Sequence, residues 1–215
     1  METYRLVFSP IDVNTYILAD VSGDCAIIDC GCYDDDEFAM LENFLNEKNL
    51  KPVLLLNTHC HLDHVFGNRY IFKKYNLRPW ACELDETNRK NASHHASLFG
   101  LVMDEPPYPG HFIKDGEIIS FGSISLVALY VPGHSPGSIA FYSEENESVF
   151  TGDALFAGSI GRTDLPGGNY ETLINSINTR LFTLPPSTVV NPGHGGETTI
   201  GTEVLTNPFF TSQKS

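Results

Sequence analysis

The sequence predicts an α/β protein in which two mixed sheets pack face to face, with helices on the outside. Three observations support this prediction. Short apolar runs typical of strands precede helical stretches, and this order occurs twice along the 215 residues. Hydrophobic residues make up 41% of the chain and charged residues 19%, a globular composition that excludes a disordered or fibrous protein. No linker or low-complexity tract interrupts the sequence, so we expect one domain spanning residues 1–215.

The first half of the chain begins with three expected strands, each bounded by turn residues, at residues 4–8, 15–19 and 25–29. A helix follows at residues 35–48, because Phe38, Leu41 and Leu45 recur at helical spacing. Its first turn is rich in Asp and Glu, which suits the positive end of the helix dipole, and we prefer this interpretation to metal binding. A buried strand and two helical stretches complete this half, at residues 52–56, 65–75 and 83–99.

The second half repeats the order of strands and then a helix. Four strand-like runs are expected, at residues 117–121, 124–131, 138–142 and 148–150. A helix near residues 171–182 and a last strand at residues 188–190 follow them. The Pro-rich loop at residues 105–110 joins the two halves, and the repeated order is what predicts two packed sheets.

The charge and the termini exclude several classes of partner. The chain carries 13 Lys and Arg against 27 Asp and Glu, a formal net charge of −14 at pH 7. Nucleic-acid affinity depends on clustered cations, so we expect no nucleic-acid partner. The sequence shows neither a signal peptide nor a run approaching the roughly 18 apolar residues of a membrane span. Five cysteines indicate free thiols, so we expect a cytoplasmic protein without a membrane partner, and its oligomeric state stays open.

Four strand-like runs end in a turn that carries side chains able to bind a metal. Strand ends along one sheet edge lie close together, so we expect these side chains to converge. They are His59, His61, Asp63, His64, His134, Asp153 and His194. Imidazole and carboxylate ligands suit Zn(II), Fe(II) or Mn(II). Seven ligands are too many for one tetrahedral ion but fit two ions that share a carboxylate, for which Asp153 is the natural candidate.

A structural role is the alternative for each of these residues. A single histidine is more often hydrogen-bonded than metal-bound, but several unpaired ionisable groups are costly to bury together, which disfavours this alternative for residues 59–64. His94, His95 and His111 belong to no such turn, and we expect them to be surface residues. Cys60 lies between two candidate ligands, where alternation points its side chain away, so we expect a buried structural thiol.

The motif His59-x-His61-x-Asp63-His64, followed by His134, Asp153 and His194, resembles the metallo-β-lactamase superfamily. The resemblance spans most of the chain, and residues 152–168 are similar to the short glyoxalase II-like hydrolases. It implies an αββα four-layer sandwich, the metallo-β-lactamase fold, with a dinuclear site on one edge. It also implies that His59, His61 and His134 bind the first ion, that Asp63, His64 and His194 bind the second, and that Asp153 bridges them.

The resemblance favours thioester hydrolysis of the glyoxalase II (hydroxyacylglutathione hydrolase) kind. The expected substrate is an S-acylglutathione such as lactoylglutathione, or a related thioester, attacked by hydroxide bound to two divalent ions, Zn²⁺ or else Fe or Mn. Asp63 is the candidate catalytic residue, because a carboxylate there can orient the nucleophile or handle its proton. Arg162 is the candidate substrate contact, since its guanidinium can hold a carboxylate, although an ion pair with Asp164 is equally expected.

Two alternatives to this hydrolase remain open. A persulfide dioxygenase would use a single Fe(II) on His59, His134 and Asp153, and related sequences share the patterns at residues 58–64 and 161–164. A non-catalytic metal-binding or regulatory domain is disfavoured, because all seven ligands are present. Full-length glyoxalase II proteins carry a further C-terminal helical domain that helps bind glutathione, whereas this chain stops soon after Phe210. The thiol carrier of the substrate therefore stays open.

Overall fold

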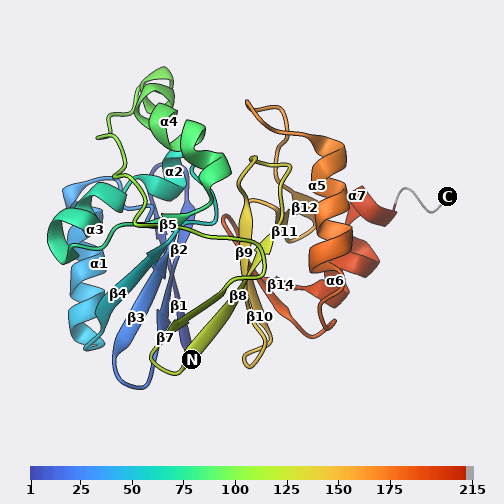
Figure 1. The fold of residues 1–215 in the computed structure, drawn as a ribbon, viewed down its shortest axis with the longest axis horizontal. Helices are drawn as coiled ribbons and strands as arrows, with labels where there is room; N and C mark the ends of the chain where they lie inside the picture. The colour runs from blue at the N-terminus through green and yellow to red at the C-terminus, as the bar shows by residue number, and fades with distance from the viewer. Residues whose placement is uncertain (212–215) are drawn as a thin grey trace.

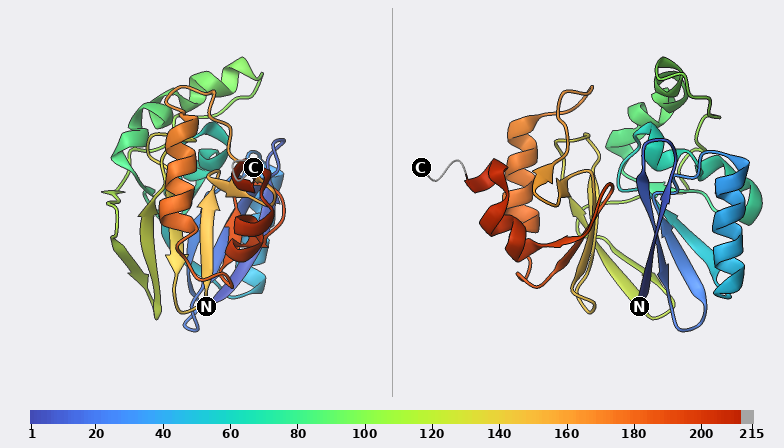
Figure 2. Two further views of the ribbon diagram at one scale, coloured as in Figure 1. Left: turned by 90° about the vertical axis from the view of Figure 1, so that its right-hand side faces the viewer. Right: turned by 180° about the vertical axis from the view of Figure 1, so that it is seen from behind.

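The computed structural model describes residues 1–211 and places two six-stranded sheets face to face (Figure 1). Helices α1 (Asp35–Glu47) and α3 (Asn68–Tyr75) cover the outer side of the first sheet. Helices α5 (Tyr170–Ser176), α6 (Ile200–Thr206) and α7 (Pro208–Thr211) cover the outer side of the second sheet. The view from behind in Figure 2 shows the same four layers, so the predicted α/β sandwich is confirmed.

The first sheet has the strand order β1-β2-β3-β4-β5-β6. Its strands are β1 (Glu2–Phe8), β2 (Val13–Ala19), β3 (Asp24–Ile28), β4 (Lys51–Leu56), β5 (Trp80–Ala81) and β6 (His111–Phe112). The pairs β1–β2 and β2–β3 are antiparallel, and β3 to β6 are parallel. Ile28 pairs with Leu56, so β3 and β4 end side by side, and the residues that follow them share one edge of the sheet.

The second sheet has the order β14-β13-β10-β9-β8-β7. Its strands are β7 (Ile118–Phe121), β8 (Ile124–Tyr130), β9 (Ile139–Ser143), β10 (Ser148–Gly152), β13 (Val189–Pro192) and β14 (Thr198–Thr199). Only β10 and β13 pair in parallel among these described strands, so their C-terminal ends also lie together. A hairpin of β11 (Leu155–Phe156) and β12 (Ser159–Ile160) follows β10.

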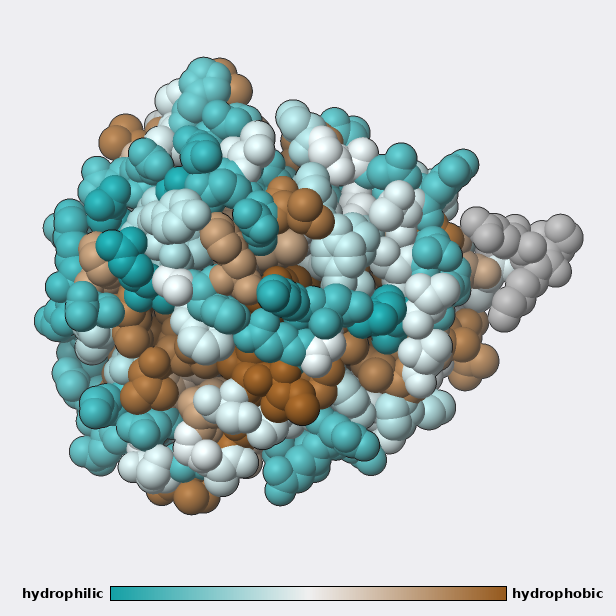
Figure 3. Space-filling model, viewed as in Figure 1, coloured by the Kyte–Doolittle hydropathy of each residue, from teal (hydrophilic) through white to brown (hydrophobic). Residues whose placement is uncertain are grey.

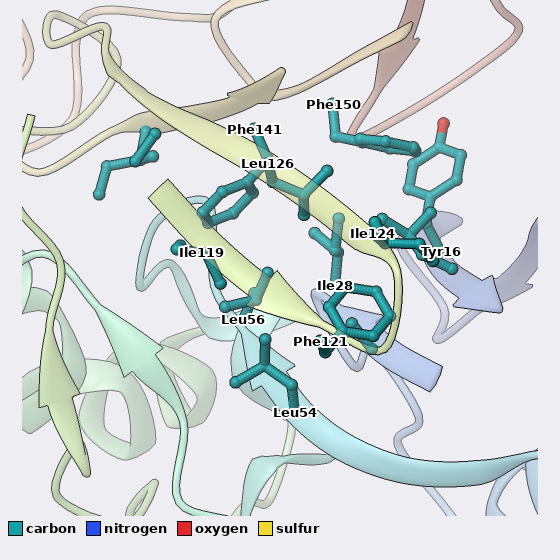
Figure 4. Close-up of a cluster of buried hydrophobic side chains, with 14 of the residues drawn as sticks. Tyr16, Ile28, Leu54, Leu56, Ile119, Phe121, Ile124, Leu126, Phe141 and Phe150 are labelled. Atoms are coloured by element: carbon teal, nitrogen blue, oxygen red, sulfur yellow. The ribbon is translucent and has the colours of Figure 1, made fainter. Parts of the chain in front are cut away.

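The main core lies between the two sheets (Figure 4). Figure 4 shows Ile28 and Leu56 of the first sheet facing Phe121 and Leu126 of the second. Because strand side chains alternate between faces, Phe121 of β7 is buried in this core while Ile118 of the same strand is exposed. Burying each large apolar side chain contributes about 1.5–3 kcal/mol, so this layer is a large part of what holds the sheets together.

The helices begin where the sequence offers capping side chains. The Asp34 side chain accepts a hydrogen bond from the Glu37 backbone N–H at the start of α1, and Leu41 and Leu45 of that helix are buried against the first sheet. At the start of α5 the Asn169 side chain accepts from the Thr172 N–H in the same way. The helix expected at residues 171–182 ends earlier, at Ser176, and continues as one π-helical turn, Ile177–Leu181.

The middle of the chain departs most from the sequence prediction. The helix expected near residues 65–75 is divided into α2 (Leu62–Val65) and α3. The helical stretch expected at residues 83–99 is a 3-10 turn (Glu83–Asp85) followed by α4 (Glu86–Leu98), which stands above the first sheet in Figure 1.

No helix within residues 1–211 combines the length and apolar character needed to cross a membrane. Figure 3 shows a group of apolar side chains across the lower centre of this face of the molecule, with hydrophilic side chains around it.

Candidate metal centre

The seven expected ligands all follow strand ends at one edge of the sandwich. The segment after β4, which includes α2, carries His59, His61, Asp63 and His64. The loop after β8 carries His134, the turn after β10 carries Asp153, and the loop after β13 carries His194. The structure brings these side chains into two adjacent groups of three, with Asp153 between them.

The first group consists of His59, His61 and His134, whose ligand atoms lie within 4.8 Å of one another. The Nε2 atom of His134 lies 2.8 Å from His61 Nδ1 and 3.2 Å from His59 Nε2. Burial, reinforced by the neighbouring histidines, lowers the pKa of His59 and lowers the pKa of His61 to about 3. Both rings are therefore neutral at pH 7, which is the form that binds a metal ion.

The second group consists of Asp63, His64 and His194. The Oδ2 atom of Asp63 lies 3.1 Å from His194 Nε2 and 3.6 Å from His64 Nε2. Burial acts to lower the pKa of His64, but the carboxylates of Asp153, Asp63 and Asp29 outweigh it, and the pKa is raised. The negative potential that favours a proton on His64 also favours a divalent cation at this position.

Asp153 lies between the two groups. Its Oδ2 atom is 3.6 Å from His134 Nε2 and 3.7 Å from His194 Nε2, while its Oδ1 atom is 3.3 Å from His64 Nε2. Burial would raise the pKa of Asp153, but the neighbouring histidines, His64 foremost, lower it, so the side chain is an anion. His64 Nε2 and Asp153 Oδ1 are buried without a hydrogen-bond partner in the described part of the chain. Two orphaned ligand atoms in a His/Asp cluster fit divalent metal ions.

The outer ring nitrogens of three ligands are held by the chain itself. The contacts are His64 Nδ1 to Asp29 Oδ2 at 2.8 Å, His134 Nδ1 to the Arg162 carbonyl at 2.8 Å, and His194 Nδ1 to the Asp12 carbonyl at 3.1 Å. A carbonyl or carboxylate oxygen only accepts, so each Nδ1 carries a proton, and Nε2 is the ring nitrogen left to face a metal ion at the centre. Asp29 belongs to no motif of the sequence and lies inside the strand predicted at residues 25–29, but in the structure it directly follows β3, as the ligands follow their strands.

Cys60 and two of the other histidines lie away from the centre. Cys60 is buried in an apolar cluster with Leu62 and Val65, and burial raises the pKa of its thiol. His94 is exposed, and His111 pairs through Nε2 with Glu117 Oε1 at 2.6 Å. Cys60 is buried and His94 is exposed, as the sequence predicts, whereas His95 and His111 are half-buried and not the surface residues that it predicts.

The metal centre forms the floor of a cavity of about 450 Å³. One wall comes from helix α4 and the residue after it, a second from the loop that follows β12, and a third from the turn between β1 and β2. The first wall contains Asn88, His95, Leu98 and Phe99, the second contains Arg162, Leu165 and Pro166, and the third contains Ile11. His95 is half-buried and lines this cavity, so it is not the simple surface residue that the sequence predicts. Sequence spacing alone could not reveal this, because the opposite wall comes from a segment about 70 residues further on.

Arg162 lines the cavity but its guanidinium is already paired. Its Nε atom donates to Asp164 Oδ1 and its Nη2 atom to Asp164 Oδ2, each across 2.7 Å. This hydrogen bonding lowers the pKa of Asp164 to about 2, so the pair is ionised at neutral pH. The ion pair expected from the sequence is present, and a substrate carboxylate would have to share the guanidinium with Asp164 or displace it.

The class of protein follows from the fold, the cluster and a family comparison. Residues 9–194 match the family model of the metallo-beta-lactamase superfamily. The chain belongs to this superfamily and is of its metallo-hydrolase class. The fold and the family resemblance predicted from the sequence are thereby confirmed.

Individual relatives are similar over nearly their full length. The chain is 39% identical over 214 residues to a probable metallo-hydrolase, YqgX, of Bacillus subtilis strain 168, with 98% of each chain covered. It is 38% identical over 202 residues to hydroxyacylglutathione hydrolase GloC of Haemophilus influenzae, with 93% of each covered. The solved structure of TTHA1623 in a di-iron-bound form is 37% identical with a TM-score of 0.87, covering 96% of this chain and 99% of that one. The BLEG-1 B3 metallo-beta-lactamase is 32% identical with a TM-score of 0.90, covering 98% and 100%.

Proposed function

We propose that this chain hydrolyses thioesters at a centre of two divalent ions. The proposed substrate is an S-acylglutathione such as lactoylglutathione, or a related thioester, and the products are a carboxylic acid and a free thiol. The observation that carries the proposal is the place of Asp153, whose Oδ2 atom is 3.6 Å from His134 Nε2 and 3.7 Å from His194 Nε2. A carboxylate so placed can be shared by two ions. The similarity to a protein named hydroxyacylglutathione hydrolase supports the choice of substrate.

The two groups of side chains divide the ions between them. His59, His61 and His134 would hold one ion, Asp63, His64 and His194 the other, and Asp153 would bridge them. Zinc is the proposed metal, although iron and manganese suit the same ligands, and the similarity to a di-iron-bound protein makes iron the first alternative to measure. Ions of this kind lower the pKa of water and stabilise negative charge that develops on a carbonyl oxygen.

Asp63 is the proposed catalytic residue. Burial alone would raise its pKa, but His64 and the hydrogen bond with His194 lower it, so the carboxylate is ionised at pH 7. The carboxylate would accept a proton from the attacking water or hold that water in line with the substrate carbonyl carbon. The water oxygen would then bond to the carbonyl carbon, the carbon–sulfur bond would break, and the thiolate would leave with the electron pair and take a proton from solvent, while Asp63 returns its proton to solvent.

Metal content and thioester turnover of the purified protein test this proposal together. We expect two divalent ions per chain and hydrolysis of lactoylglutathione or another member of a small thioester panel. His59→Ala and Asp153→Ala are expected to lower kcat/KM by roughly 100-fold or more, because each removes a ligand. His94→Ala is the control, since His94 is an exposed histidine outside the centre.

Three outcomes would contradict the proposal. The first is turnover that is unchanged in His59→Ala or Asp153→Ala, and the second is no hydrolysis of any thioester after metal addition. The third is a single iron per chain with sulfite formation and oxygen uptake from a persulfide, which would favour the dioxygenase alternative.

A further inference from the structure

Helix α4 presents one side to the cavity above the metal centre. Asn88 and His95 of the helix line the cavity and are seven residues apart, a spacing that places them on one side of it, and Phe99, the residue directly after the helix, lines the cavity with them. Leu98 adjoins them and also lines the cavity. Leu98 and Phe99 are 69% and 68% exposed, which is high for apolar side chains. The end of α4 therefore offers an apolar surface directly above the cluster of ligands.

The opposite side of the cavity is also largely apolar. Leu165 and Pro166 line it from the segment leading into α5, and Ile11 lines it from the turn between β1 and β2. Figure 1 shows α4 and the segment before α5 rising on either side of the strand ends. Exposed apolar side chains that gather around one cavity mark a binding site, whereas single ones scattered over a surface do not.

The α4 wall is fixed to the loops that carry the ligands. Asp85, at the start of α4, is fully buried and accepts hydrogen bonds from the backbone N–H groups of Cys60 and Gly137, each at 2.7 Å. Cys60 lies between His59 and His61, and Gly137 lies three residues after His134. One carboxylate thus joins the start of the helix to both halves of the first ligand group, so this end of α4 keeps its place relative to the centre.

From these contacts we infer that the cavity selects thioesters with an apolar group of several carbon atoms beside the scissile bond, held by Leu98 and Phe99. This inference rests on the proposed thioester hydrolysis and names the substrate class of the same site. The apolar group can belong to the acyl half of the substrate or to its thiol half. Each methylene buried against the wall is expected to raise kcat/KM by up to about fourfold, the factor that corresponds to burying one CH₂ group.

Two series of thioesters test the inference and distinguish these sources. One series carries acyl groups from acetyl to octanoyl on one small thiol, and the other carries acetyl on alkyl thiols of the same lengths. We expect kcat/KM to rise with length in at least one series. Leu98→Ala and Phe99→Ala are expected to lower it roughly 10-fold for the longest members and to leave the shortest within twofold.

Leu205→Ala is the matched control, because Leu205 is an exposed leucine on α6, 76% exposed, and does not line the cavity. It is expected to leave both series unchanged. Truncating exposed side chains changes stability little, and melting curves of all variants check that each is folded. The inference is overturned if both series are flat in the wild-type protein, or if Leu98→Ala affects the shortest and longest substrates equally.

Binding of the product halves tests the wall without any catalysis. Alkyl carboxylates and alkyl thiols of increasing length are titrated by calorimetry onto the metal-loaded wild-type protein and onto Leu98→Ala and Leu205→Ala. We expect affinity to rise with length in the wild type and in Leu205→Ala, and to rise less in Leu98→Ala. This result without hydrolysis of any thioester would refute the proposed reaction while leaving the apolar subsite in place. Affinity independent of length in the wild type would refute the subsite itself.

Discussion

His64 donates from Nδ1 to Asp29 Oδ2 across 2.8 Å, and this contact decides which ring nitrogen faces the metal centre. Asp29 also accepts from the Thr58 backbone N–H at 2.8 Å and from the Thr58 hydroxyl at 2.6 Å. It occupies the left-handed region, with a φ of 52°, directly after β3. One carboxylate therefore fixes both the His64 ring and the segment after β4 that carries most of the ligands.

Replacing Asp29 by Asn is expected to weaken metal binding without unfolding the protein. An amide has one oxygen, which can accept from Thr58, and its NH₂ group cannot accept from His64 Nδ1. We expect metal affinity to fall roughly 10- to 100-fold, as for other partners of ligating histidines. Chelator competition measures it, with Asp24→Asn at the far end of the same strand as control. Equal affinity in both variants would mean that His64 is oriented without Asp29.

The architecture could be predicted from the sequence because the strands and helices that define it are long enough to show an apolar pattern. The runs that became β2, β4 and β8 are apolar over most of their length, and the ligands stand directly after strand-like runs. A sheet edge gathers whatever follows its strands, so the arrangement of the seven expected ligands needed no knowledge of long-range contacts. Asp29 obeys the same rule, but a single polar residue at the end of the run predicted at residues 25–29, with no histidine beside it, gives no motif.

The walls of the cavity could not be predicted in this way. Asn88 and His95 share one side of α4, but the same spacing is typical of any helix face, and nothing local distinguishes a cavity from solvent. The strands β5, β6 and β14 have two residues each, too few to show a period. Both failures have one physical cause, since these features depend on partners that are distant in the sequence.

The Arg162–Asp164 ion pair predicts how affinity for anionic substrates responds to mutation. Asp164→Asn removes the carboxylate that occupies both guanidinium nitrogens, so Arg162 becomes free to bind a substrate carboxylate. We expect KM for an anionic thioester to fall about two- to fivefold with little change in kcat, as for an exposed charge pair. Arg162→Gln is expected to raise KM. A neutral thioester of equal size is the control, and a similar change in its KM would contradict this assignment.

The same pair predicts a flat pH dependence for that effect. Hydrogen bonding from Arg162 lowers the pKa of Asp164 to about 2, so the pair is intact above that value and is lost only as pH falls through it. The KM ratio of Asp164→Asn to wild type is therefore expected to stay constant between pH 5 and pH 8. A ratio that approached one at pH 5 would show that the carboxylate is protonated there and that the pair is weaker than its geometry implies.

Asp20 joins the two sheets through hydrogen bonds that we expect to weaken in acid. Its carboxylate follows β2 and accepts from the Ser123 hydroxyl and backbone N–H, in the turn between β7 and β8, and from the Ser22 N–H. These hydrogen bonds lower the pKa of Asp20, so its stabilisation is present above the unfolded-state value of about 3.9 and is lost as pH falls below it. We expect Asp20→Asn to melt a few degrees below wild type at pH 7, with the gap narrowing below pH 4. Glu145→Gln, at an exposed carboxylate of the β9–β10 turn, is the control, and a gap that widened in acid would reverse the argument.

At Gly193 the backbone passes so close to the metal centre that there is no room for a side chain. A Cβ atom at this position would overlap Asp153 Oδ1 and lie 2.7 Å from His64 Cε1, so Gly193→Ala must displace the carboxylate proposed to bridge the ions. Gly196→Ala is the matched control, because its Cβ would meet no atom within 4 Å. We expect Gly193→Ala to lose at least one metal ion per chain and to lower thioester turnover by roughly 100-fold, while its circular dichroism stays native. Full metal content in Gly193→Ala would mean that Asp153 can move aside without cost, which would remove the geometric basis for its bridging role.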